Sequence, residues 1–246
     1  MNNFKAFSAI AFLWTGIITA AETSPTELLK ASDRARGGLL KGLEWKVQLK
    51  TIEAGSTTER EFGIEAKGDD ALIEALSPAR NKGEVYLFND RDMWFYKPGL
   101  RKPISISARQ RLSGQAANGD IASTHYSRDY EGSIVGKTKI DGEPVFILDL
   151  KAKDKKVTYD RIKYYISEKS KLAMKAEFLS LEGEPFKVAT FKYGNSILSS
   201  GQKIQFISRM TITDSKFAEN ISDITYVNPK EKDFSGSKFN INNLAR

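Results

Sequence analysis

The 246-residue sequence predicts a mainly β protein with a few helices, in which an antiparallel sheet curls into a barrel or half-barrel. From Trp45 onward, apolar and polar residues alternate with a period of two, as in strands with one wet face. Turn signals separate on the order of ten such runs at the spacing of a meander. No helical pattern lies between successive runs, which disfavours a parallel α/β sheet.

The first residues have the pattern of a secretory signal peptide. Lys5 precedes the apolar run 6–19, and Thr19-Ala20-Ala21 offers the small residues that signal peptidase requires. We therefore expect residues 1–21 to be removed and the mature chain to begin at Glu22. The alternative is an uncleaved membrane anchor, which the shortness of the apolar run disfavours.

One helix is expected close to this cleavage site. Ser24-Pro25-Thr26-Glu27 is a capping box with proline at the first helical position, and Gly37-Gly38 is a stop signal. A modest apolar stripe lies between them, made by Leu28, Leu29, Ala31 and Ala35. Such a stripe suits a helix that lies across a sheet.

Most of the remaining chain is predicted to form strands. Apolar residues alternate with polar ones over 172–178 and 204–212, and Asp141-Gly142 is the two-residue turn of a hairpin between 134–140 and 143–151. No internal repeat or linker is visible, and the hydrophobic content of 40% supplies one sizeable core. Residues 22–246 are therefore expected to form a single domain.

The segment 98–130 interrupts the strand pattern with prolines and glycines. Ser107-Ala108-Arg109-Gln110 has the pattern of a cap for one short helix, and residues 120–130 have that of a second. A long insert inside a meander is usually a functional lid or a binding loop. A covering loop that only plugs one barrel end is the equally weighted alternative.

The residue types leave little basis for catalysis. The chain has one histidine, His125, and no cysteine, so the usual metal site lacks ligands and we expect no metal or cofactor. The sequence contains no nucleophile elbow for which His125 could act as the base. We therefore expect His125 to be a polar residue of the lid rather than a member of a catalytic triad. Paired-carboxylate hydrolysis stays open because the pairing is spatial. The candidate carboxylates are Asp90, Asp92, Asp120, Asp129 and Asp149. We predict a binding protein rather than an enzyme.

The charge balance limits the partners. The formal net charge of +7 falls to +6 when residues 1–21 are removed, since Lys5 is their single charged residue. Acidic and basic residues are interspersed, which permits weak attraction to anionic lipid headgroups but does not favour nucleic acid. Without a cysteine the mature N-terminus cannot be acylated. We expect a soluble monomer with no lipid anchor.

The densest apolar feature is a pair of neighbouring runs, Glu84-Val85-Tyr86-Leu87-Phe88 and Asp92-Met93-Trp94-Phe95-Tyr96. Both faces of these strands carry large apolar groups, so each strand must be covered twice. The ordinary explanation is a central strand buried by the N-terminal helix. The functional one is a concave surface kept open for an apolar ligand. Trp94 and Tyr96 share one face and are assigned to the cavity; Met93 and Phe95 share the other.

Basic residues follow these strands. Leu100-Arg101-Lys102-Pro103 comes first, and then Arg109 and Arg111. Guanidinium and ammonium groups at the mouth of an apolar cavity suit a phosphate or a carbonyl oxygen. Plain soluble surface is the alternative for this segment.

Several segments together resemble the LolA-like outer-membrane lipoprotein-sorting proteins. They are DMWFYKP (92–98), RQRLSGQAANGD (109–120), Asp129-Tyr130, the hairpin at Asp141-Gly142 with residues 148–153, Thr158-Tyr159-Asp160-Arg161, and the ending with Phe239 and Leu244. The resemblance spans nearly all of the mature chain.

This resemblance implies an incomplete antiparallel β-barrel, a LolA-like half-barrel, with a helical lid over an apolar cavity. It implies a periplasmic carrier that binds lipoprotein acyl chains or other, phospholipid-like lipids for transfer toward the outer membrane, with an inner-membrane transporter as a further partner. The residues then expected to contact lipid are Met93, Trp94, Phe95, Tyr96, Arg101, Arg109 and Arg111. No local motif places the cavity arginine of such carriers in this sequence.

Two alternatives remain open. The first is a lipid-binding accessory or sensor subunit of an inner-membrane exporter of the RND type. The second is a cofactor-free enzyme on the same fold, because a fold does not determine a function.

Overall fold

The computed structural model describes residues 23–122 and 124–244. The expected signal peptide, residues 1–21, lies outside the described residues. In the described part, thirteen strands form one large sheet. They are β1 (Leu43–Glu53), β2 (Ser56–Lys67), β3 (Asp70–Ser77), β4 (Val85–Asn89), β5 (Asp92–Tyr96), β6 (Ile104–Ile106), β9 (Tyr130–Ile140), β10 (Glu143–Ala152), β11 (Arg161–Ser167), β12 (Ala173–Leu179), β13 (Pro185–Lys192), β16 (Arg209–Asp214) and β17 (Ile221–Glu231).

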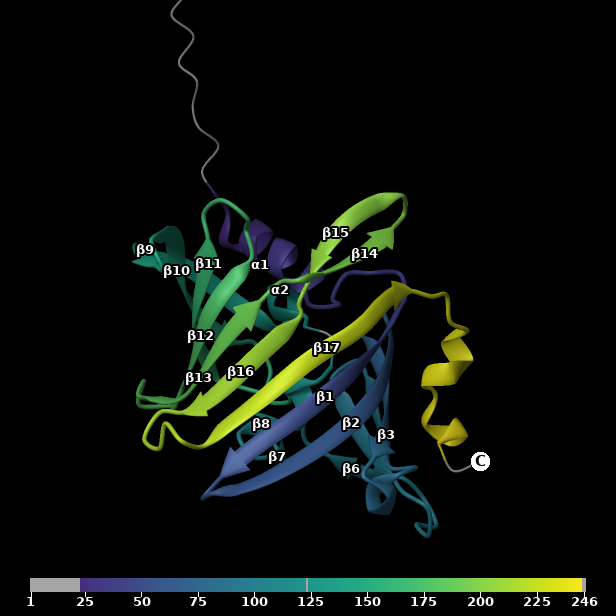
Figure 1. Cartoon of the computed structure of the whole chain (residues 1–246). Coiled ribbons are helices and arrows are strands. Elements are labelled where there is room, and N and C mark those ends of the chain that lie inside the picture. Colours follow the sequence, from purple (N-terminus) through teal and green to yellow (C-terminus); the bar gives the residue numbers. More distant parts are fainter. Residues whose placement is uncertain (1–22, 123, 245–246) are drawn as a thin grey trace, which may run out of the picture.

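This sheet curves into a half-barrel that stays open (Figure 1). Hydrogen-bonded neighbours follow the order β6-β5-β4-β3-β2-β1-β17-β16-β13-β12-β11-β10-β9. Each neighbouring pair is antiparallel, and β1 pairs with β17 in the middle of the sheet. The edge strands β6 and β9 do not pair with each other. The prediction of an incomplete antiparallel β-barrel is therefore confirmed.

The other elements are short. Two small sheets are made by β7 (Arg111–Ser113) with β8 (Ala116–Ala117), and by β14 (Asn195–Ser199) with β15 (Gln202–Phe206). The β14–β15 hairpin projects beyond one end of the sheet (Figure 1). The helices are α1 (Pro25–Arg34), α2 (Tyr126–Asp129) and the 3-10 turns η1 (Ala79–Asn81), η2 (Asn118–Asp120), η3 (Gly236–Phe239) and η4 (Ile241–Asn243).

Two local predictions have different outcomes. Asp141 and Gly142 have φ angles of 50° and 81°, the left-handed values that a two-residue hairpin turn requires, and they join β9 to β10 as predicted. The helix α1 begins at Pro25 as predicted, but the Ser24 side chain caps no backbone N–H. The predicted capping box is therefore wrong, and Glu27 instead pairs with Lys30 one turn later, at 2.8 Å.

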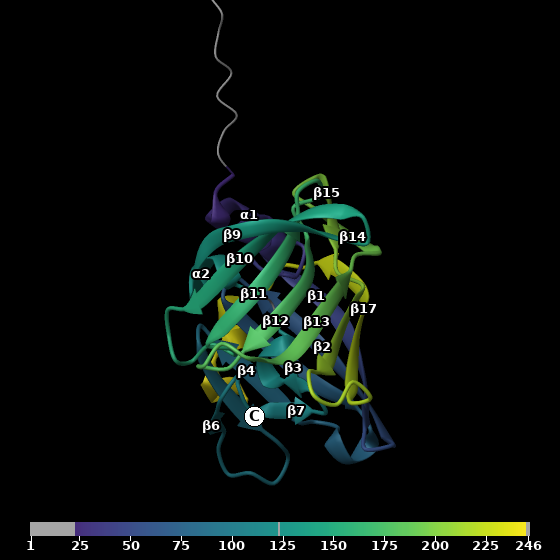
Figure 2. The ribbon, with the colours of Figure 1, turned by 90° about the vertical axis from the view of Figure 1, so that its left-hand side faces the viewer.

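The concave face of the half-barrel holds the main hydrophobic core. On β1, Val47 and Leu49 alternate with polar residues and are at most 1% exposed, and Phe62 on β2 is fully buried. The helix α1 lies across one end of the half-barrel (Figure 2) and adds Leu28 and Leu29 to the same core. This is the helix lying across a sheet that the apolar stripe predicted.

A second, smaller core lies on the outer face of β4 and β5. Here Leu87 is covered by Phe234, Phe239 and Leu244. These three residues belong to the C-terminal arm, residues 232–244, which runs along the outside of the half-barrel (Figure 1). The strands that are apolar on both faces are thus covered twice, on the outside by the end of the chain.

The insert after β5 crosses the open side of the half-barrel, and we call residues 98–129 the lid segment. It contains β6, β7, β8, η2 and α2. The helix α2 lies within the predicted second helix. Residues 107–110 form a hydrogen-bonded turn, with the Gln110 N–H donated to the Ser107 carbonyl at 3.1 Å, and not the predicted first helix. Prolines and glycines limit this part to short turns.

Candidate ligand-binding site under the lid

Arg36 lies deep in the apolar interior although it carries a charge. It follows α1 directly, and the side chain is only 4% exposed. Its guanidinium carbon lies 5.3 Å from the ring centroid of Tyr126 and 4.6 Å from that of Phe191, and one terminal nitrogen donates to the Tyr164 hydroxyl at 3.3 Å. Cation–π contacts of this kind offset part of the lost hydration.

The same guanidinium is only partly satisfied. Within residues 23–122 and 124–244, Nε has no hydrogen-bond acceptor and no ion pair includes Arg36. A guanidinium cannot lose its proton in a protein, and a buried charge without a partner costs several kcal/mol. A donor held in this way suits the carbonyl or phosphate oxygen of a ligand.

The cavity beside Arg36 is small. Its volume is about 60 Å³, and Tyr126 and Tyr130 line it together with Asp120 and Ala122. Pockets that bury a drug-sized ligand measure roughly 300–1,000 Å³. The interior is therefore filled by side chains, and the structure is a closed form that has room for a few waters at most.

One set of buried hydrogen bonds connects the lid segment to α1. The Asp33 carboxylate accepts the backbone N–H of Tyr126 at 3.0 Å and that of Ser127 at 2.8 Å, as well as the Ser127 hydroxyl at 2.7 Å. Burial raises the pKa of Asp33 to about 6, while these hydrogen bonds act in the opposite direction. A buried carboxylate at the start of α2 also interacts favourably with the N–H groups of its first turn.

A second set of buried hydrogen bonds connects the lid segment to Tyr159 and to strand β17. The Asp120 carboxylate accepts the Tyr159 hydroxyl at 2.8 Å and the Ala117 N–H at 2.8 Å. The Tyr226 hydroxyl of β17 donates to the Asp120 carbonyl at 3.5 Å. Burial raises the pKa of Asp120 above its ordinary value.

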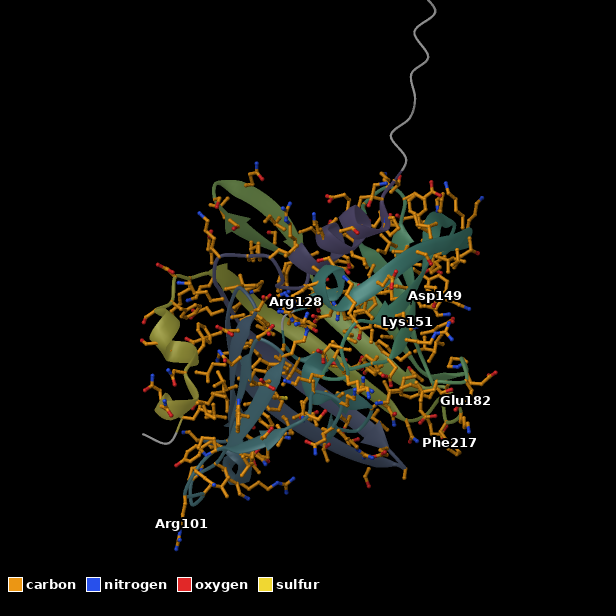
Figure 3. All side chains as sticks on the ribbon, turned by 180° about the vertical axis from the view of Figure 1, so that it is seen from behind. Arg101, Arg128, Asp149, Lys151, Glu182 and Phe217 are labelled. Carbon is orange, nitrogen blue, oxygen red and sulfur yellow. The ribbon has the colours of Figure 1, made fainter. Side chains whose placement is uncertain are left out.

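The outer edge of the lid is held by charges. Arg128 lies in the open side of the half-barrel (Figure 3) and contacts Asp69 at 2.8 Å and Asp90 at 2.9 Å, on the β2–β3 and β4–β5 turns. Arg109 makes a bidentate pair with Asp160, with distances of 2.6 and 2.7 Å. All three pairs are partly exposed, so each contributes at most about 1 kcal/mol.

Apolar as well as polar contacts attach the lid to the core. Its buried apolar residues are Ala108, Ala116, Ala117, Ile121 and Ala122. Ile106, Leu112 and Tyr126 are partly buried and pack against the main core, where the ring of Tyr126 contacts those of Tyr130 and Tyr164. The buried Asp33 and Asp120 carboxylates therefore act together with apolar packing in holding the lid.

A shallow recess with a mixed lining opens where the lid meets the free edge of the sheet. It has a volume of about 450 Å³ and is lined by Tyr86, Phe95, Ile106 and Leu112 together with the polar residues Gln110, Arg111 and Asn118. The rings of Tyr86 and Phe95 are 5.0 Å apart. The structure thus brings two of the residues predicted from sequence, Phe95 and Arg111, into one recess.

The other predicted residues lie apart from this recess. Met93 shares the inner face with Phe95 and is 2% exposed, whereas Trp94 and Tyr96 pack on the outer face against the second core. The prediction that Trp94 and Tyr96 face the cavity is therefore wrong in placement, because the C-terminal arm covers their side. Arg101 points away from the molecule at a loop tip (Figure 3). Contact of these residues with lipid stays a prediction.

Arg109 and Arg111 have partners within the chain. Arg109 binds Asp160 and also donates to the Val157 carbonyl at 2.8 Å, whereas Arg111 pairs with Glu53 at the end of β1. Arg111 is the more exposed of the two. It is therefore freer to exchange its partner for a ligand oxygen.

Each candidate carboxylate contacts an arginine, a lysine or a tyrosine. Asp90 and Asp129 bind Arg128, Asp92 binds Lys156 and Asp149 binds Arg161, while Asp120 is held by Tyr159. In the described residues, no group of three or more acidic or histidine side chains is placed to hold a metal ion.

His125 is buried at the lid. Its Nδ1 lies 3.4 Å from the Asp69 carboxylate, and burial lowers the pKa of His125. It is thus uncharged at neutral pH and is placed as the sequence predicted for a polar lid residue.

Sequence reasoning missed Arg36, Asp33 and Tyr159. The available signal for Arg36 was its position just before Gly37-Gly38, where a charged residue follows a helix that must cross an apolar sheet. Composition alone does not distinguish it from Arg34, which lies two residues earlier and is exposed.

Comparison with known proteins supplies the family. A family model described as an uncharacterized protein matches residues 67–246, more than half of the chain. A LolA superfamily protein from Nitrosomonas europaea is similar in structure, with 25% sequence identity and a TM-score of 0.80 over 89% of this chain and 98% of that one. The chain belongs to the LolA-like family.

A further LolA-like structure agrees in fold. An outer membrane lipoprotein-sorting protein domain from Vibrio parahaemolyticus has 19% identity and a TM-score of 0.76, over 90% of this chain and 98% of that one. A search of curated proteins finds no match. Across the described ranges, no helix of this LolA-like chain is long and apolar enough to cross a membrane.

Proposed function

We propose that this LolA-like chain is a periplasmic carrier that binds acyl chains of lipoproteins or other lipids under its lid and delivers them toward the outer membrane. The observation that carries the proposal is an apolar concave face that contains a partly satisfied arginine and is closed by a lid held through the Asp33 and Asp120 carboxylates. In this proposal residues 1–21 are removed as a signal peptide, and the rest acts as one domain.

The closed interior requires an opening step. Because the cavity beside Arg36 measures only about 60 Å³, an acyl chain must displace the lid segment before it binds. Displacement of the lid uncovers apolar surface on the concave face and on the lid residues Leu112, Ile121 and Tyr126. A bound acyl chain covers that surface again, and the hydrophobic effect then favours the loaded state.

In this proposal two basic groups recognise the polar end of the lipid. The Nε–H of Arg36 has no acceptor within the described residues, and Arg111 lines the recess together with Phe95 and Leu112. We propose that the recess is the access route and that Arg36 binds an ester carbonyl or phosphate oxygen once the chain is inside. The reaction is binding and release, with no covalent step, as expected for a carrier rather than an enzyme.

Lipid loading tests the proposal. The mature chain from Glu22 is incubated with a diacylated peptide or a dipalmitoyl phospholipid, and bound species are measured by native mass spectrometry. We expect one acylated ligand per chain and weaker loading of Phe95→Asp, which places a charge on the recess wall. Leu198→Asp, on the projecting β14–β15 hairpin, serves as the control. A wild-type chain that stays unloaded with both lipids contradicts the proposal.

A further inference from the structure

Exposed apolar side chains gather at one end of the half-barrel. Of the eight large apolar residues that are exposed in the described part of the chain, four lie on three neighbouring turns. They are Leu181 at 74%, Phe217 at 56%, Phe186 at 40% and Ile52 at 37% exposure. We call these three turns, residues 52–56, 180–186 and 214–220, the acidic rim.

The three turns are adjacent because their strands are adjacent. The sheet order β1-β17-β16-β13-β12 places the β1–β2, β16–β17 and β12–β13 turns along one end. Ile52 pairs with Ile221 in the β1–β17 register, and the Ser215 N–H donates to the Phe186 carbonyl at 3.1 Å. Figure 3 shows Phe217 and Glu182 at the same end of the half-barrel. Four strand spacings give the rim a length of about 19 Å.

The charge of the rim is opposite to that of the chain. Its turns carry five carboxylates and one lysine, a formal charge of −4, whereas the whole chain is at +7. The carboxylates are Glu53, Glu182, Glu184, Asp214 and Glu219, and the lysine is Lys216. Three cations border the rim. Arg111 pairs with Glu53, Lys187 donates to the Gln115 carbonyl at 2.6 Å, and Arg161 lies beside Gly183 while it pairs with Asp149. Even with all three included, the rim keeps a net negative charge.

We infer that the acidic rim is a docking surface for a protein partner, one that presents lysines or arginines around an apolar depression. Apolar tips surrounded by charge are the arrangement of an interaction site, and the sign of the charge selects the partner. An anionic bilayer is disfavoured, since its surface attracts basic segments and repels carboxylates. This inference rests on the proposed carrier function, in which the partner is the membrane protein that loads or unloads the chain.

The rim also contacts the lid segment. Lys187 and Ser222, on the strands that lead into the rim, hold both backbone groups of Gln115, with Ser222 Oγ accepting the Gln115 N–H at 2.8 Å. The ring of Phe186 lies 6.2 Å from that of Tyr159, which holds Asp120. A partner bound to the rim therefore lies next to the contacts that keep the lid closed.

Sedimentation with membranes tests the docking surface. The labelled mature chain is mixed with envelope vesicles of its own source cells, sealed with the periplasmic side outward, with the same vesicles after trypsin treatment, and with liposomes of their extracted lipids. We expect binding to the untreated vesicles alone. Leu181→Ser with Phe217→Ser, and separately Glu182→Lys with Glu219→Lys, should each weaken that binding by about tenfold.

The controls use equally exposed residues elsewhere. Leu198→Ser and Val135→Ser remove apolar side chains that are 67% and 57% exposed and lie off the rim, and both variants should bind as the wild type does. All of these positions are exposed, so unfolding midpoints in urea should agree and exclude misfolding as a cause.

Several results would overturn the inference. Equal binding to liposomes of extracted lipids would mean that the rim binds a lipid surface. A rim-dependent dimer in sedimentation equilibrium would mean that the rim binds a second copy of this chain. Vesicle binding that is absent, or that the rim substitutions do not change, would also contradict the inference. Lipid loading of the rim variants is measured in parallel. If the rim variants load lipid normally but no longer bind the vesicles, the docking surface is distinct from the lipid cavity. If the wild-type chain takes up no lipid but still binds the vesicles through the rim, the carrier proposal is refuted and the docking surface is not.

Discussion

The carboxylate of Asp33 accepts both the backbone N–H and the hydroxyl of Ser127, at 2.8 and 2.7 Å. It lies in the last turns of α1, which packs on the core, while Ser127 belongs to α2 in the lid segment. Opening the lid at α2 must therefore break these bonds together with that from the Tyr126 N–H. Asp33 connects the protonation of one buried group to the closure of the lid.

The first prediction concerns the pH dependence of stability. Burial raises the pKa of Asp33 from 3.8 to about 6, so between these values the folded protein binds a proton that the unfolded chain does not. The contribution of Asp33 therefore raises the free energy of unfolding as the pH falls through 6, and this increase is complete below pH 3.8. From about pH 8 to about pH 4.5 we expect a gain of about 2 kcal/mol.

Comparison with Asp33→Asn isolates this contribution in urea titrations. Other groups shift in either direction: burial raises the pKa of Asp120 and lowers that of His125. These are common to both proteins, so the difference in unfolding free energy reports Asp33. A difference that does not change across this pH range would show that the Asp33 pKa is not raised.

The second prediction concerns Arg36. Replacing it by leucine removes a buried charge that forms no ion pair among the described residues, so the free energy of unfolding should stay equal or rise by about 1–4 kcal/mol. Lipid loading should weaken by about tenfold or more, since a charged hydrogen bond to the ligand is lost. Arg34→Leu, the same change at an exposed position in α1, should alter neither quantity. A destabilised Arg36→Leu that still loads lipid would assign Arg36 to folding.

The third prediction concerns the outer edge of the lid. Arg109→Ala breaks a partly exposed bidentate pair with Asp160, so the loss of global stability should stay within about 1 kcal/mol. Amide hydrogen exchange should nevertheless rise over residues 107–120, and lipid uptake should become faster.

The matched control for this change is Arg209→Ala. Arg209 also makes a bidentate pair, with Asp223, at 3.0 and 2.6 Å across β16 and β17, although it donates through Nε and one terminal nitrogen. It should leave exchange in the lid unaltered. Equal exchange in both variants would mean that the Arg109–Asp160 pair does not hold the lid.

The fourth prediction separates the two faces of β5. Phe95→Asp should impair lipid loading, because Phe95 lines the recess under the lid. Trp94→Asp should instead loosen the C-terminal arm, which packs on its side, and limited proteolysis should then cut within residues 232–244. If Trp94→Asp abolishes loading while the arm stays protected, the original assignment of Trp94 to the cavity is restored.

Sequence reasoning was most reliable where a local rule applies. Asp141-Gly142 requires left-handed angles that few residues adopt, so the hairpin could be placed to the residue. The open sheet and its family followed from alternation and from segments spread over the chain. The number of strands was underestimated, since β6, β7 and β8 have two or three residues each and no measurable alternation.

The site was less predictable for physical reasons. A strand that is apolar on both faces, such as β5, has no wet side to give its orientation. The C-terminal arm that covers Trp94 follows more than 130 residues later. The role of Arg36 depends on its contacts with Tyr126 and Phe191, which are distant in the sequence and lie beside it only in the folded protein.

The pairing of β1 with β17 has a consequence for how this chain folds. Residues 43–53 can complete their hydrogen bonds only after residues 221–231 are available, so the centre of the sheet is closed by the most distant contact in the sequence. Topologies dominated by such non-local pairings fold slowly. Truncation between β16 and β17 would leave β1 and β16 with free edges, and a chain shortened in this way should aggregate through those edges.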